Sequence, residues 1–200
     1  QVLCWGGGGP YNLSVPHGVS HTEVYKSIWI VIDAVNKWEA LLFSYPKEHH
    51  QQKEIAKGFQ LKNRAGFGSC CGCIDGMLLW MDKPNKSNCK LAKVGSGKFF
   101  CGRKKKFGLC FQGICDADRK FLDICIKHPS SMSDYLAFCT SSVKYKVDHP
   151  GFLAEGLCLF GNSVYVNNEY MATPFKAVSL GIKDDYIFYH SQLHINVECC

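Results

Sequence analysis

Cys71-Gly72-Cys73-Ile74-Asp75-Gly76-Met77-Leu78-Leu79-Trp80-Met81 is an apolar run that holds a single charged side chain, Asp75. A run of this length and composition is typical of a central strand that is covered on both faces of its sheet. Burying a carboxylate there is costly unless it is hydrogen-bonded, paired with a charge or bound to a metal ion. Asp75 is therefore either a strand-edge residue bonded to the backbone or a functional residue.

Upstream of this strand the sequence has a helical pattern. Gln1–Gly18 is rich in Gly and Pro and is predicted to be a loop. Ser20-His21-Thr22-Glu23 matches a capping box, and the run that follows ends before Pro46. A shorter polar helix is expected over His50–Phe59. The apolar residues at helical spacing in the longer helix are Val24, Ile28, Val31, Ile32, Val35, Trp38, Leu41 and Leu42.

Downstream, the pattern predicts strands that alternate with helices. A polar turn over Asp116–Lys120 joins two β-strands, and a Lys-, Asn- and Gly-rich loop covers Pro84–Gly102. The order predicts an α/β domain over residues 65–200, preceded by a loop and helical segment over residues 1–64. The remaining expected elements are strands over Lys106–Cys115, Phe121–Lys127 and Leu157–Phe160, and helices over Ser131–Thr140 and Tyr186–Cys200.

Composition excludes several classes of protein. With 46% hydrophobic and 20% charged residues, the 200-residue chain can bury a core, so wholesale disorder is excluded. No apolar run approaches the roughly 20 residues that a membrane helix needs. The 13 cysteines are an odd number at irregular spacing and no signal peptide is readable, so we expect reduced, buried thiols and a protein that is not secreted. The net charge of +6 favours a polyanionic partner.

Two patterns leave a zinc site open. His190, His194 and Glu198 follow one another at four-residue spacing, so they lie on one face of the predicted last helix; the alternative is a solvated polar face. Cys70 and Cys73 form a C-x-x-C pair, but the later Cys89 and Cys101 lack the spacing of a zinc ribbon, and buried thiols explain the pair as well. A cysteine-rich zinc regulator would require stoichiometric zinc.

A basic cluster with interleaved phenylalanines follows the long loop. Such a cluster is either a phosphate-binding surface or a solvated loop. Its charged members are Lys98, Arg103, Lys104, Lys105 and Lys106.

Several blocks, taken in order, resemble the PIF/Harbinger-type DDE transposase nucleases. The resemblance covers roughly Gly66–Cys200, and the order of the blocks makes it specific. Upstream, Gly18–Tyr25 resembles the second helix of a helix-turn-helix whose first helix is missing or degraded. The blocks are Gly72–Gly76, Phe99–Lys104 with Phe107-Gly108, Cys115–Asp118 with Phe121–Asp123, His128–Asp134, Leu159–Tyr165, Met171–Phe175 and His190–Cys199.

The resemblance implies a ribonuclease H-like mixed sheet flanked by helices, in which three acids gather at one point. Asp75 corresponds to the first acid and Glu198 to the third, while Asn162 stands at the second position. Three such carboxylates hold two divalent ions, and Mg²⁺ (or Mn²⁺) suits oxygen ligands. We therefore expect Asp75 and Glu198 to converge in space, with Asn162 beside them.

Departures from the family pattern predict an impaired copy. Asn162 supplies no charge, His194 stands where relatives often have Arg, and the chain stops two residues after Glu198. The resemblance thus implies a truncated or decayed transposase-derived endonuclease domain that acts on DNA in the nucleus. It also implies a separate DNA-binding partner protein. The alternative is a non-catalytic DNA- or protein-binding descendant on the same scaffold.

Overall fold

The computed structural model describes residues 10–39, 43–91, 93–176 and 181–200. Two compact units divide the chain, Gln1–Leu42 and Phe43–Cys200. No helix within the described residues has the length and apolar character needed to cross a membrane. The predicted boundary at residues 64 and 65 stays a prediction, because the division into compact units does not test the extent of the nuclease domain.

The described part of the first unit contains the α-helices α1 (Pro10–His17) and α2 (His21–Lys37). The Ser20 side chain accepts a hydrogen bond from the backbone N–H of Glu23 at 3.2 Å, as the capping box predicts. The prediction of a loop over Gln1–Gly18 is wrong at Pro10–His17, where the structure has α1. Pro10 is its first residue, a position that the fixed φ angle of proline favours. Residues 1–9 of that loop, and Leu41 and Leu42 of the predicted long helix, lie outside the described residues.

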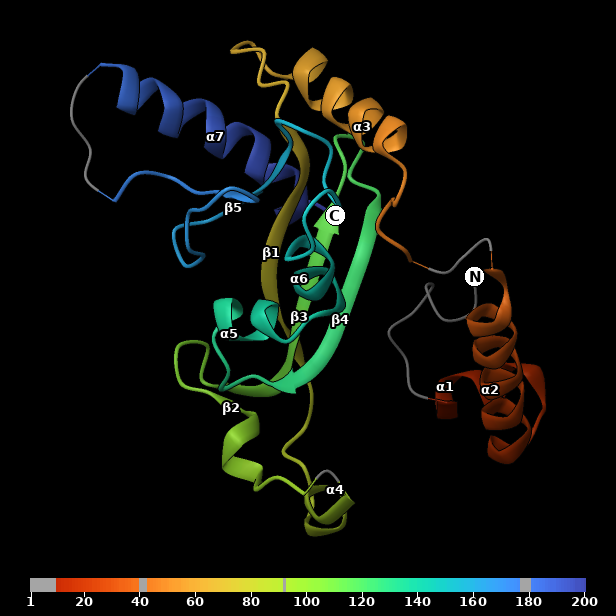
Figure 1. Ribbon diagram of the computed structural model, residues 1–200. Helices are drawn as coiled ribbons and strands as arrows, with labels where there is room; N and C mark the ends of the chain where they lie inside the picture. The colour runs from red at the N-terminus through yellow and green to blue at the C-terminus, as the bar shows by residue number, and fades with distance from the viewer. Residues whose placement is uncertain (1–9, 40–42, 92, 177–180) are drawn as a thin grey trace. The chain divides into compact units, whose positions relative to one another are not determined.

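The second unit is built on a six-stranded mixed sheet in the order β2-β3-β1-β5-β6, with β4 paired to β3 (Figure 1). The antiparallel part comprises β1, β3, β4 and the short β2, whereas β5 and β6 run parallel to β1. The strands are β1 (Cys70–Trp80), β2 (Phe100–Cys101), β3 (Lys106–Cys115), β4 (Phe121–Pro129), β5 (Cys158–Gly161) and β6 (Met171–Ala172).

Helices cover both faces of this sheet. In Figure 1, α5 and α6 lie in front of the strands, while α3 and α7 pack against β1. The predicted mixed sheet flanked by helices is confirmed. The helices are α3 (His49–Lys62), α4 (Lys86–Leu91), α5 (Asp134–Cys139), α6 (Ser142–Val147) and α7 (Ile182–Glu198), with a 3₁₀ turn η2 (Ser96–Phe99).

Strand β1 divides its side chains between two cores. Cys71 and Ile74 join the core beneath α5 and α6, whereas Cys70 and Cys73 join the core beneath α3 and α7. The register of β1 against β5 shifts between Cys70 and Cys73, so these two residues, three apart, face the same side. A side chain at Gly72, inside the shift, would approach Ile114 to 2.8 Å. Because side chains alternate along a strand, the bulge therefore sets the face of the sheet to which Asp75, two residues after Cys73, points.

Several elements differ from the sequence-based expectation. The predicted loop Pro84–Gly102 contains α4, η2 and β2, which are too short to show periodicity. The predicted helix Ser131–Thr140 begins only at Asp134, because Ser133 caps it, and α7 begins four residues earlier than predicted. The turn at Asp116–Lys120 is confirmed: Asp116 Oδ1 accepts hydrogen bonds from the N–H groups of Asp118 and Lys120.

Tyr45 ties the segment before α3 to the sheet, since its buried hydroxyl donates to the carbonyl oxygen of Cys71 at 2.9 Å. We expect Tyr45→Phe to lower the free energy of unfolding by about 1–2 kcal/mol, because a buried acceptor loses its partner. Urea denaturation measures the change. Tyr145→Phe, at a ring that is 71% exposed, is the matched control and should change stability by less than about 0.5 kcal/mol. Equal stability of both variants would contradict the assigned role of the Tyr45 hydroxyl.

Candidate functional site

The pairing of β1 with β5 brings Asp75 and Asn162 together. Ile74 pairs with Gly161 in parallel register. The residues that follow them, Asp75 in β1 and Asn162 just after β5, therefore lie next to each other. The side-chain amide of Asn162 donates from Nδ2 to Asp75 Oδ1 at 2.7 Å. Its Oδ1 accepts from the backbone N–H of Val164 at 2.9 Å. Both ends of the Asn162 amide are therefore engaged.

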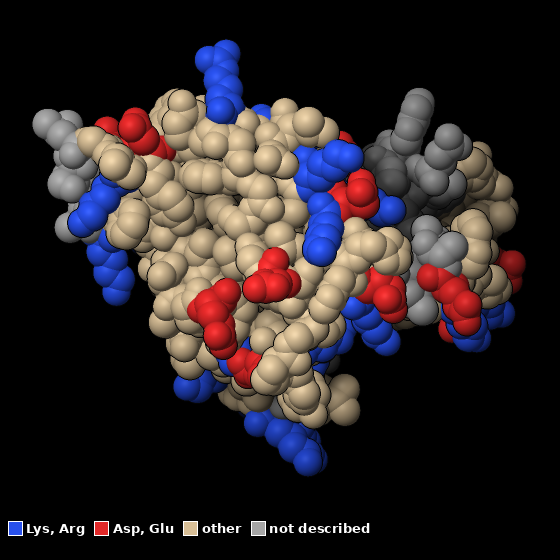
Figure 2. Space-filling view, turned by 45° about the horizontal axis from the view of Figure 1, so that its top comes forward, with Lys and Arg blue, Asp and Glu red and all other residues tan. Residues whose placement is uncertain are grey.

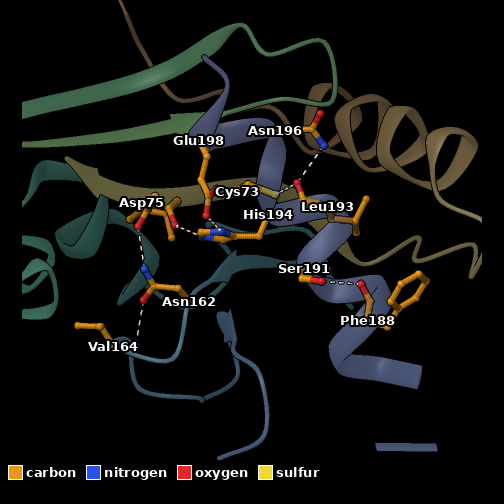
Figure 3. A network of polar contacts seen from close by, with 11 residues as sticks. Cys73, Asp75, Asn162, Val164, Phe188, Ser191, Leu193, His194, Asn196 and Glu198 are labelled. Carbon is orange, nitrogen blue, oxygen red and sulfur yellow. Dashed lines mark hydrogen bonds and ion pairs between the residues drawn. The ribbon is translucent and has the colours of Figure 1, made fainter. Parts of the chain in front are cut away.

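Helix α7 adds two more polar side chains, His194 and Glu198, which are one turn apart. His194 is buried, and its Nε2 lies 3.0 Å from the carbonyl oxygen of Ile74. Its Nδ1 lies 3.6 Å from Glu198 Oε1, and Glu198 is more than half exposed. Figure 3 shows the side chains of Asp75, Asn162, His194 and Glu198 pointing toward one another. Leu193 and Val197 of the same turns are buried in the core and fix the helix against β1.

Asp75, His194 and Glu198 can place one ligand atom each within 4.8 Å of one another. Two carboxylate oxygens and an imidazole nitrogen are a donor set that fits one divalent cation. Asn162 turns its N–H toward Asp75 and its oxygen toward Val164, so the amide presents a donor rather than a ligand oxygen to Asp75. The residues present therefore fit a single ion better than the pair of ions that three carboxylates would hold.

The electrostatics around Asp75 favour a bound proton or cation. Burial raises the pKa of the Asp75 carboxyl above its ordinary value, and the neighbouring carboxylates of Asp134 and Glu198 raise it further. His194 and a backbone hydrogen bond from Gly76 act in the opposite direction. A carboxyl group in this setting gains more from a nearby cation than one in water does.

The predicted convergence of Asp75 and Glu198, with Asn162 beside them, is confirmed as geometry. Their catalytic or metal-binding roles stay proposals. Asn162, His194 and Glu198 also line an open cleft of about 790 Å³ between α7 and the segment that follows β6.

The predicted face of His190, His194 and Glu198 needs a correction. His190 is almost fully buried, its Nε2 lies 3.2 Å from the carbonyl oxygen of Ala172, and its ring stacks on Phe160. Among the described residues, Asp75 rather than His190 completes the group that could hold a metal. Sequence spacing along one helix could not reveal a partner from β1.

The C-x-x-C pair is a pair of buried thiols. Cys70 and Cys73 are fully buried, and their sulfur atoms lie 3.8 Å apart. Burial raises the pKa of both thiols, which favours their protonated form. The potential metal group found among the described residues contains no cysteine.

The basic cluster lies in and beside the β2–β3 hairpin, with Lys98 in η2, Arg103–Lys105 in the turn and Lys106 at the start of β3. Lys106 Nζ lies 3.2 Å from the ring centroid of Trp80, five residues beyond Asp75 on β1. Arg103 lines a smaller cleft with Gly76 and Asp134. Figure 2 shows both basic and acidic side chains on the face drawn, at several separate places. Of the cluster, Arg103 thus has the clearest link to the β1 residues around Asp75.

Asp134 is the residue near the site whose importance sequence reasoning underestimated. It begins α5, and its carboxylate lies so close to Gly76 that any side chain there would clash with it. Burial raises the pKa of Asp134, while Arg103 acts to lower it. The only sequence signal was its place at the end of the His128–Asp134 block.

The family model described as DDE superfamily endonuclease matches residues 74–200, which is more than half of the chain. The chain belongs to this family. The matched region begins in β1 and includes Asp75, Asn162 and Glu198. The mixed sheet is thus that of a ribonuclease H-like DDE domain, as the resemblance implied.

A protein of Arabidopsis thaliana named "Protein ALP1-like" is 24% identical over 139 residues. The match covers 70% of this chain and 31% of that protein, so the chain spans about a third of the relative. This likeness supports the Harbinger-type assignment and a transposase-derived nuclease domain. No solved structure matches the chain significantly.

His190 should make stability depend on pH, because burial lowers its pKa to about 4. The unfolded chain, with an ordinary value near 6.5, binds a proton between these limits while the folded chain does not, so stability falls as the pH drops. From pH 7 to pH 5 the wild type should lose about 2 kcal/mol more than His190→Gln, which keeps an N–H for Ala172. Urea titrations at both pH values test this, and parallel pH curves would contradict it.

Proposed function

We propose that this nuclease domain acts on DNA phosphodiester bonds with the help of a divalent ion, and that Asn162 impairs it. The observation that carries the proposal is the meeting of Asp75, Asn162 and Glu198 from β1, the end of β5 and α7. Segments separated by 123 positions converge only because the fold brings them together. Membership of the DDE endonuclease family gives this convergence its chemical meaning.

In this proposal Asp75 and Glu198 hold the cation, which the resemblance takes to be Mg²⁺ or Mn²⁺. Such an ion activates a water or hydroxyl nucleophile and stabilises charge on the leaving oxygen. The Asn162 amide holds one oxygen of Asp75, and the carboxylate lies close to ligand atoms of His194 and Glu198. Glu198 stands at the exposed rim of the cleft, where a phosphate group can approach.

Asn162 supports impairment for two reasons. An amide brings no negative charge to a site that must balance a dication and a phosphate. Its orientation is also fixed, because a carboxylate can only accept from Nδ2 and a backbone N–H can only donate to Oδ1. The oxygen that could serve as a ligand is therefore turned into its own loop.

DNA is proposed as the partner, with Lys98 and Arg103–Lys106 as contacts to its phosphates. The basic side chains in and beside the β2–β3 hairpin are exposed, so they are free to contact phosphates. Each phosphate that such a side chain neutralises releases counterions, which favours binding. We also propose a nuclear location, a separate DNA-binding partner protein, and residues 1–64 as a helix-turn-helix remnant. The helices α1 and α2, which follow one another with Gly18 between them, support the last of these.

The alternative is a non-catalytic descendant that binds DNA or protein. The hydrogen bond between Asn162 and Asp75 favours it, since it replaces a metal–ligand contact with a bond inside the protein. Cleavage and binding assays on the same samples separate the two functions.

Asn162→Asp should improve metal binding and raise DNA nicking by about a hundredfold, the usual effect of restoring one charged group at a preorganised site. Plasmid nicking with Mg²⁺ or Mn²⁺ and calorimetric titration of the metal measure the two effects. The double variant Asp75→Asn/Asn162→Asp keeps the new charge but removes the first ligand, and should be inactive. Strong Mg²⁺-dependent nicking by the wild type, abolished in Asp75→Ala, would contradict impairment.

Binding to duplex DNA should weaken steeply with salt. Lys104→Ala should flatten the log–log slope by about 0.9, because one phosphate contact is lost. Lys57→Ala, at an exposed lysine of α3, is the control and should leave the slope unchanged. Fluorescence anisotropy across a salt series gives both slopes. Binding that does not depend on salt concentration, or equal slopes for the two variants, would contradict a role of the β2–β3 hairpin in DNA binding.

A further inference from the structure

His194 has two ring nitrogens with different surroundings. Nε2 lies 3.0 Å from the carbonyl oxygen of Ile74, an atom that can only accept, so this nitrogen carries a proton. Nδ1 is left to face Glu198 Oε1 at 3.6 Å, and an oxygen of Asp75 lies within 4.8 Å of the group. Glu198 disfavours the negative charge of Asp75, so a proton or a cation between the two carboxylates would relieve their repulsion.

This arrangement has the features of a metal-binding histidine. Such residues usually donate their second ring nitrogen to a backbone carbonyl or a carboxylate, which fixes the ring and aims the free nitrogen at the ion. Here the carbonyl belongs to Ile74, the residue before Asp75. One strand therefore supplies a carboxylate ligand and also orients the imidazole.

The position expected for a second ion lacks ligands. Asn162 turns an N–H toward Asp75 and its oxygen toward Val164, so in this orientation it presents no oxygen to a second ion beside Asp75. Asp134, the other nearby acid, starts α5 and lies against Gly76. Neighbouring residues of a strand face opposite sides of the sheet, so Asp134 lies on the side opposite to the Asp75 side chain. The remaining donors form a single site of one nitrogen and two oxygens.

Such a donor set changes the preferred ion. Mg²⁺ favours oxygen ligands in octahedral geometry, whereas imidazole nitrogen favours later divalent ions such as Co²⁺ and Zn²⁺. We propose that Asp75, His194 and Glu198 form a single-ion site that selects a transition-metal ion over Mg²⁺ through His194 Nδ1. The inference rests on the proposed function in taking Asp75 and Glu198 as metal ligands.

Thiols are the main competitors for such ions. The exposed Cys199 and Cys200 follow Glu198 directly, and Cys139 is also exposed. Co²⁺ is therefore the probe of choice, because thiolate coordination adds an intense near-ultraviolet charge-transfer band that imidazole and carboxylate ligands do not give. Replacing Cys199 and Cys200 with Ser supplies a background in which these two thiols cannot contribute.

The test compares His194→Gln with His190→Gln in that background. Gln at position 194 keeps an N–H for Ile74 but removes the ligand nitrogen, while position 190 is a buried histidine one turn earlier and outside the metal group. We expect Co²⁺ to bind the parent more tightly than Mg²⁺, without the thiolate band. His194→Gln should weaken Co²⁺ binding by about tenfold or more and leave Mg²⁺ binding unchanged, whereas His190→Gln should change neither.

Unchanged Co²⁺ affinity in His194→Gln, or Mg²⁺ binding as tight as Co²⁺ binding in the parent, would overturn the proposal. If His194→Gln does not fold, the parent protein alone decides. Pulsed electron paramagnetic resonance of bound Mn²⁺ should then detect a directly coordinated nitrogen, and its absence would overturn the proposal equally.

The same samples separate this inference from the nuclease function. Co²⁺ binding that depends on His194, without DNA cleavage by any variant, would refute the nuclease activity and leave the metal site standing. DNA nicking by the parent, together with a Co²⁺ affinity that His194→Gln does not change, would refute the single-ion site and leave the nuclease activity standing.

Discussion

The parallel pairing of β1 with β5 is the constraint on which the candidate site depends. Because Ile74 pairs with Gly161, the residues that follow them, Asp75 and Asn162, must share one edge of the sheet. The same stretch of β1 offers the Ile74 carbonyl to His194, so α7 is aligned by the strand that carries the first acid. A slip of one residue in this pairing would turn Asp75 to the opposite face and dismantle the group.

Much of this arrangement could be predicted from the sequence. The long apolar run around Asp75 predicts a central strand because a strand covered on both sides needs apolar residues throughout. The convergence with Glu198 could not follow from periodicity, since nothing local links positions so far apart; the order of the family blocks supplied it. Membership of the DDE endonuclease family and the mixed sheet bear out that resemblance.

Other features were beyond the reach of sequence patterns. The strand β6 has two residues, α4 has six, and elements this short lack a measurable period. The bulge near Gly72 sets the facing of Cys73 and Asp75 through pairing with another strand, which alternation alone does not encode. Tertiary packing likewise brings Asp134 close to Gly76. It also places Asp75, and not His190, beside His194 and Glu198.

Glu198 is the last helical residue of α7, one turn beyond His194. Terminal turns open more readily than helix interiors, with Val197 as the last buried anchor before the end. If this final turn frays and docks, that local equilibrium would take the group apart and assemble it again. A cation that binds only the docked form would stabilise the last turn of α7 by mass action. Occupancy of the site and hydrogen-exchange protection of the last amides of α7 would then rise together.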